Sequence, residues 1–362
     1  MARVNPSPYL LGAVAGYLAD TALADPRRGH PVALFGTAAG RLERRLWRDH
    51  RGTGAAFTAL SVGTVAAGAV LADRALRRRP WARSALAAAS AWTVLGGTSL
   101  TREARTIGRF LEAGDLAAAR ERLPHLCGRD PSALDGQQIA RAVVESVAEN
   151  TADAVVNALT WGALAGTPGL LAFRAVNTLD AMVGHRSPRH LRFGWASARL
   201  DDVAGWPGAR LTALLTVAAA EHPRAAWKVW RRDGSSHPSP NAGQAESAFA
   251  GGLGVRLGGT LRYGDGVPPE TGVPPAEGWG RVEHRPVLGA ELRPVDVPDI
   301  ERACRLSRRV GMLALAVTTA AHALGRTSLG RAAPGRTGLI GVRAPGWPIP
   351  VPGFARMRRS VT

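Results

Sequence analysis

Residues 55–72, AAFTALSVGTVAAGAVLA, form a run of 18 residues without a charged side chain. A second uncharged run of the same length, SALAAASAWTVLGGTSLT, covers residues 84–101. A helix crosses the hydrocarbon core of a membrane with about 20 predominantly apolar residues. Both runs approach that length and are rich in Ala and Gly, so as spans they would depend on close helix packing through small residues.

Other apolar stretches cover residues 4–19, 154–173, 203–220 and 310–325, and of these only 203–220 contains a charged residue, Arg210. Together with the first two runs they predict an all-α fold, a multi-pass integral membrane helical bundle in the cell membrane. The alternative is a soluble all-α protein whose Ala-rich helices are buried in a core.

Polar segments separate the apolar runs. Charged and apolar residues alternate between 102 and 146, which predicts amphipathic helices that face solvent. Residues 221–309 are expected to form a long polar loop region, irregular over the Pro- and Gly-rich part from 264 to 298. We therefore expect one membrane domain over 1–325 and a loosely ordered, basic, Pro- and Gly-rich tail over 326–362.

The formal net charge is +18, almost all of it from arginine. Such a charge suggests a nucleic-acid-binding protein, but the arginines are scattered along the chain and no nucleic-acid-binding signature is present. We expect no nucleic-acid partner, because arginines also gather at the cytoplasmic ends of membrane spans. The two cysteines, Cys127 and Cys304, lie far apart, which argues against a disulfide framework and a zinc site.

Three acidic residues are spaced at intervals of four: Glu145, Glu149 and Asp153. On a helix these carboxylates would share one face, where like charges cost stability unless a cation or a basic partner lies beside them. A magnesium site made from one or two carboxylates and a substrate phosphate fits this pattern. An ordinary solvated helix face is the alternative.

Two further motifs could bind phosphate. Arg199 can hold a phosphate or a carboxylate with two hydrogen bonds, and Asp201 and Asp202 can hold a metal or pair with Arg199. The Pro-containing turn from His237 to Asn241 could surround a phosphate with backbone amides, or it could be a simple turn.

In their order along the chain and in their residues, several segments resemble the signature segments of the CobD/CbiB family. These segments are Asp25-Pro26 with His30-Pro31-Val32, Glu145 to Asp153, Asn177 to Gly184, Phe193 to Asp202, and Asp233 to Gly243. The resemblance covers about residues 8 to 325. It departs from the family at Ala24 and Ala154, where the family usually has Gly, and at Gln244-Ala245, where the family usually has Trp-Pro.

The amino-terminal helix also resembles a secretory signal, because Ala22-Leu23-Ala24 is typical of a cleavage site. Asp25 and His30 follow that helix directly and belong to the family pattern. The resemblance therefore implies that the helix is retained.

The resemblance implies an ATP- and magnesium-dependent amide ligase of cobalamin biosynthesis. Such an enzyme joins the free propionate of adenosylcobyric acid to (R)-1-amino-2-propanol or its phosphate, and the product is adenosylcobinamide or its phosphate. The implied partners are the corrinoid, the amine, the lipid bilayer and other enzymes of the corrinoid pathway. A relative that kept the membrane fold without catalysis, a regulatory protein of the AmpE type, is the alternative.

Amide ligation needs an activated carboxylate, cationic groups on phosphate and a base for the amine. We hypothesise that Glu149, Asp153, Asp180, Asp201 and Asp202 supply metal ligands and the base, with Glu149, Asp201 and Asp202 on the metal. His30 is a candidate for proton transfer, because histidine titrates near neutral pH. Phosphate-binding roles are assigned to Arg199, His237, Ser239 and Asn241.

Overall fold

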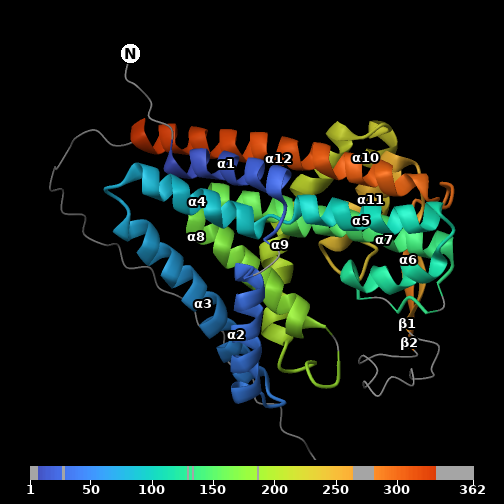
Figure 1. Ribbon diagram of the computed structural model, residues 1–362, viewed down its shortest axis with the longest axis horizontal. Coiled ribbons are helices and arrows are strands. Elements are labelled where there is room, and N and C mark those ends of the chain that lie inside the picture. Colours follow the sequence, from blue (N-terminus) through green and yellow to red (C-terminus); the bar gives the residue numbers. More distant parts are fainter. Residues whose placement is uncertain are drawn as a thin grey trace, which may run out of the picture.

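The computed structural model describes residues 7–26, 29–128, 130–132, 134–185, 187–263 and 281–331. Helices make up most of these ranges, so the all-α prediction is confirmed (Figure 1). The helices are α1 (Pro8–Leu23), α2 (Pro31–Leu46), α3 (Arg51–Ala75), α4 (Pro80–Val94), α5 (Gly97–Glu112), α6 (Leu116–Arg122), the 3₁₀ turn η1 (Leu123–His125), α7 (Gly136–Asn150), the π-helical turn η2 (Thr151–Val156), α8 (Asn157–Leu179), the π-helical turn η3 (Asp180–Gly184), α9 (Trp195–Ala219), α10 (Pro223–Asp233), α11 (Ala242–Leu253) and α12 (Pro298–Arg331). Strands β1 (Leu257–Tyr263) and β2 (Arg281–Leu288) form an antiparallel ribbon.

Small residues let α1 and α4 pack closely, as the sequence predicted, and Figure 1 shows the two helices running together. A methyl group added to Gly12 would overlap the Ala87 side chain, and one added to Gly16 would overlap Ala91. The two backbones can approach this far only because neither glycine has a side chain.

This contact gives the first prediction. Gly16→Ala should lower the free energy of unfolding by about 1–3 kcal/mol, because the new methyl group forces α1 away from α4. Gly63→Ala is the matched control, because a methyl group there meets nothing within 4 Å. The control should be neutral, or more stable by up to about 1 kcal/mol, since alanine favours a helix more than glycine does. Thermal unfolding in detergent measures both, and an equal response of the two variants would contradict this packing.

Two helical paths in the described ranges are long and apolar enough to cross a membrane: Arg51–Ala75 and Gly136–Gly184. The prediction of one helix over 84–101 is wrong, because the chain is extended at Leu95, between α4 and α5. The carboxylate of Asp20 accepts hydrogen bonds from the backbone N–H and the hydroxyl of Thr98 and so stabilises the new helix start. The multi-pass membrane bundle therefore stays a prediction.

The Gly136–Gly184 path is not a straight rod. Gly166 lies in the left-handed region, with φ of 66°, and a side chain on Gly169 would overlap the carbonyl oxygen of Trp161. A straight helix from Glu149 to Asp180 would be about 45 Å long. The reversal at Gly166 instead returns Asp180 to the neighbourhood of Glu149.

The predicted polar loop over 221–309 is wrong for most of its length, because it contains α10, α11, the ribbon and the start of α12. Every residue of α11 is buried, although its sequence is mostly Ala, Gly and polar residues with little hydropathy. The expected irregular segment 264–298 includes β2, while 264–280 lies outside the described residues. Helix α12 continues past residue 325 to Arg331, and the rest of the predicted tail lies outside the described residues.

The expectation of solvent-facing helices over 102–146 also needs correction at α7. Its residues from Ile139 to Ala148 are buried except Arg141, which is half-buried. The Glu145 carboxylate accepts a 2.7 Å hydrogen bond from the Gly258 N–H, so it joins α7 to the ribbon.

Asp299 anchors the start of α12, and its contribution to stability should depend on pH. Burial raises the pKa of this carboxyl, but hydrogen bonds from Arg293, the Asp296 N–H and Arg302 outweigh burial and hold its pKa below the ordinary 3.8. The ionised group therefore stabilises the fold above pH 3.8, and this contribution is lost as the pH falls further.

Asp299→Asn should therefore be less stable than the parent protein at pH 6. The difference in unfolding temperature should shrink as the pH is lowered from 5 to 3. A difference that does not change over this range would contradict the role given to the carboxylate.

Candidate functional site

Five carboxylates from three distant segments converge, and we call them the acidic cluster: Glu149, Asp153, Asp180, Asp201 and Asp202. Glu149 lies at the end of α7, Asp153 in η2, Asp180 at the start of η3, and the last two in the first turns of α9. Asp153 lies within electrostatic range of Asp201, Glu149 and Asp180. Asp201 in turn lies within range of Asp180, Asp202 and Glu149.

The two π-helical turns shape this cluster. Each turn contains one of its aspartates, Asp153 in η2 and Asp180 in η3. A π-helical turn inserts a residue into a helix and changes the direction of the side chains, and such turns are frequent at functional sites. The simple spacing of four that the sequence suggested therefore does not hold through Asp153, and Glu145 points to the ribbon instead.

The cluster strongly disfavours uncompensated negative charge. Burial raises the pKa of Asp201 to about 7, and the charge of Asp180 contributes in the same direction. A hydrogen bond of 3.5 Å from the Asn177 amide nitrogen to the Asp201 Oδ1 opposes the shift. A bound cation would relieve the repulsion among these carboxylates.

The carboxylates fit a magnesium site in which the protein supplies only part of the ligands. Within the described ranges, no three His, Cys, Asp or Glu side chains are arranged as a ready metal site. Magnesium commonly uses one or two protein carboxylates and takes its other ligands from water and substrate phosphates. The acidic cluster can supply those carboxylates from Glu149, Asp201 and Asp202.

Arg174 is a half-buried cation beside the cluster, and the sequence analysis did not select it. Its charge acts on Asp153 and Asp25, and its Nη1 donates to the Asn177 Oδ1 over 3.4 Å. Its Nε is buried and has no hydrogen-bond partner in the described part of the chain. The available signal was an arginine placed directly after the apolar run 154–173, because ionisable residues in apolar helices are usually functional.

His30 reaches the cluster only indirectly. Its Nδ1 accepts the Val32 N–H over 3.2 Å and caps α2, and its Nε2 lies 3.8 Å from the Asp25 Oδ1. Asp25 acts in turn on Arg174. The structure therefore places His30 beside the site, with Asp25 and Arg174 between it and Asp153.

The turn from His237 to Asn241 lies against the start of α9. The Asn241 amide nitrogen donates to the Asp202 carbonyl oxygen over 2.8 Å, and its Oδ1 accepts from Arg210 over 2.8 Å. Two backbone N–H groups, of Asn241 and Ala242, donate to the Ser239 hydroxyl, and the Ser239 N–H donates to the His237 Nδ1. These amides are thus engaged within the turn, and phosphate binding there stays a prediction.

Two further polar residues, Arg199 and Asn157, lie beside the acidic cluster. Arg199 is largely exposed and its Nη1 lies 3.3 Å from the Asp202 Oδ2, so it stands at the open side of the cluster. Asn157, which sequence reasoning missed, is fully buried one turn after Asp153. Both polar atoms of its side chain lack a hydrogen-bond partner in the described structure, beside the close-packed Gly205 and Gly208 of α9.

A family model described as "CobD/Cbib protein" matches residues 13–307, which include the whole acidic cluster. The chain belongs to the CobD/CbiB family. No solved structure matches it.

Proteins named "Cobalamin biosynthesis protein CobD" are similar to this CobD/CbiB chain over most of their length. The one from Mycobacterium tuberculosis (strain CDC 1551 / Oshkosh) is 50% identical over 316 residues, 85% of this chain and 94% of the relative. That of Geobacter metallireducens is 41% identical over 288 residues, 77% of this chain and 86% of the relative. That of Chromobacterium violaceum is 39% identical over 317 residues, 85% of this chain and 95% of the relative.

Proposed function

We propose that this CobD/CbiB protein acts in cobalamin biosynthesis as an amide ligase. It would join aminopropanol, or its phosphate, to the free propionate of adenosylcobyric acid. The observation that carries this proposal is the convergence of five carboxylates from α7–η2, η3 and α9 in a family whose members are named for cobalamin biosynthesis.

A carboxylate is a poor electrophile, so ATP would activate the propionate and magnesium would offset the phosphate charge. Glu149, Asp201 and Asp202 are the residues proposed to hold magnesium, because they belong to the cluster and the charges of Glu149 and Asp202 both act on Asp201. Arg199, at the open side, would hold a phosphate oxygen with its guanidinium.

The attacking amine must lose a proton as the amide bond forms. Asp153 and Asp180 are the proposed acceptors, because their carboxylates lie within the same cluster as the proposed metal ligands. His30 would pass the proton on toward solvent through the loop before α2. Arg174 would keep Asp153 in place through its opposite charge.

We also propose a membrane location for the enzyme. Helix α3 has 25 residues and is mostly exposed, with Leu60 and Leu71 more than half uncovered. Large apolar side chains are likewise exposed on α8 at Leu164 and on α9 at Val203. A hydrocarbon environment would cover these side chains without cost.

The test uses the full-length protein purified in detergent, with adenosylcobyric acid, ATP and magnesium. One reaction contains (R)-1-amino-2-propanol and the other contains its phosphate, and mass spectrometry detects the product. Formation of adenosylcobinamide or its phosphate, dependent on ATP, supports the ligase and identifies the amine. Absence of both products from folded protein would refute the proposal and favour a non-catalytic member of the family.

A further inference from the structure

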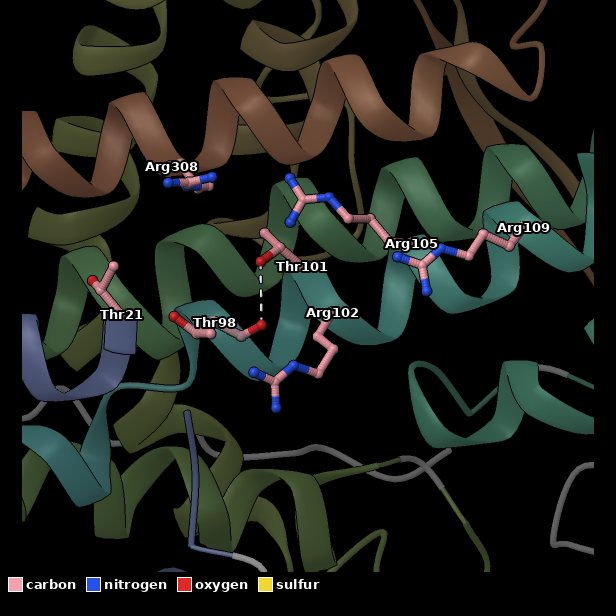
Figure 2. Close-up of a pocket in the computed structure, with 7 residues that line it drawn as sticks. All are labelled: Thr21, Thr98, Thr101, Arg102, Arg105, Arg109 and Arg308. Carbon is pink, nitrogen blue, oxygen red and sulfur yellow. Dashed lines mark hydrogen bonds between the residues drawn. The ribbon is translucent and has the colours of Figure 1, made fainter. Parts of the chain in front are cut away.

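Away from the acidic cluster, a cavity of about 300 Å³ lies between α5, α12 and the end of α1. Four arginines line it: Arg102, Arg105 and Arg109 from α5, and Arg308 from α12 (Figure 2). The three α5 arginines follow the spacing i, i+3, i+7, which places them along one face of the helix. Figure 2 shows Arg308 on the helix that faces them across the hollow.

Only part of this positive charge is balanced. Arg105 makes two hydrogen bonds to the Glu301 carboxylate, over 2.6 and 3.2 Å. The described part of the chain shows no ion pair for Arg102, Arg109 or Arg308, while Glu301 also lies 3.7 Å from Arg305. Like charges on one helix face destabilise a helix, so this arrangement favours an anion in the hollow.

A second cavity of about 250 Å³ continues from the first, because Thr21, Thr98 and Arg308 line both. Its wall is mainly apolar, with Leu18 and Met312 among its lining residues. A ligand that combines a phosphate with a less polar group therefore matches the two cavities, with the phosphate among the arginines.

We propose that the arginine-lined cavity binds the phosphate group of a phosphate ester. Guanidinium groups recognise phosphate oxygens with paired hydrogen bonds and remain charged at all physiological pH values. Glu301 holds Arg105 in a fixed orientation, while the other three arginines supply free donors to the hollow. The ester is either a soluble nucleotide or a phospholipid headgroup, and both present the same chemistry to these arginines.

Two binding measurements on the purified full-length protein, without corrinoid, separate these sources. Isothermal titration with ADP tests a soluble ester, and native mass spectrometry after addition of phosphatidylglycerol tests a lipid. We expect one of them to bind, and Arg102→Gln/Arg308→Gln to weaken that binding at least tenfold. Arg77→Gln/Arg224→Gln, which removes two exposed arginines elsewhere, is the matched control and should bind as the parent does.

The proposal is overturned if neither ADP nor phosphatidylglycerol binds, or if the Arg102/Arg308 double variant binds as tightly as the control. Because the proposed ligase also uses a nucleotide, binding of ADP alone does not support the cavity. The tenfold loss in the Arg102/Arg308 variant does, because that variant leaves the acidic cluster and Arg199 unchanged. Thermal unfolding of both double variants checks that the comparison is made between folded proteins.

Discussion

Asp201→Asn is expected to reduce product formation by roughly 100-fold or more, because it removes a proposed magnesium ligand at the point where charge develops. The substitution keeps the shape of the side chain. Asp49→Asn is the control, because Asp49 forms only an exposed pair with Arg192 on the surface. That pair contributes little to stability, so the control should retain full activity.

The same variant should behave differently in a stability measurement. Asp201 lies among half-buried carboxylates whose repulsion disfavours the folded state without a cation. Unfolding of Asp201→Asn without magnesium should therefore occur at the same temperature as the parent or higher. Lost activity with a lowered unfolding temperature would indicate damage to the fold, and full activity would remove Asp201 from the proposed site.

Arg174→Gln is expected to lower the free energy of unfolding by about 1–3 kcal/mol, because it leaves half-buried carboxylates without their cation. Asp153 and Asp25 are the groups whose charges act on Arg174. Chemical denaturation in detergent measures the loss. Arg199→Gln is the matched control, and because Arg199 is largely exposed its loss should stay below about 1 kcal/mol.

A double variant tests the cause of this loss. Arg174→Gln/Asp153→Asn removes the charge of Arg174 together with that of its partner, so it should recover part of the stability. If the double variant is only as stable as the sum of the two single changes predicts, or less stable, electrostatic pairing is not the reason for the effect of Arg174.

The sequence allowed the local features of the fold to be predicted. The charge-free runs and their small residues indicated closely packed helices, and α1 and α4 pack in that way at Gly12 and Gly16. The acids near Glu149 and Asp201 stood out because they lie beside apolar segments. These features depend on neighbours in the chain, so composition and spacing suffice to predict them.

The long-range parts could not be predicted in this way. The reversal at Gly166 brings Asp180 back to Glu149, and no periodic pattern indicates where two helical halves meet. Glu145 looked equivalent to Glu149, yet its carboxylate binds the Gly258 N–H more than 100 residues away. Helix α11 was missed because Ala and Gly give it low hydropathy, although its neighbours bury it completely.

Product formation in cells tests the ligase proposal most directly. The chain and its Asp201→Ala variant would be expressed in a bacterium that lacks its own enzyme and is supplied with cobyric acid and aminopropanol. Cobinamide is then measured by mass spectrometry. With equal amounts of the two proteins, we expect cobinamide from the parent chain and none from the variant. No cobinamide from either chain, or equal amounts of cobinamide from both, would contradict the ligase proposal.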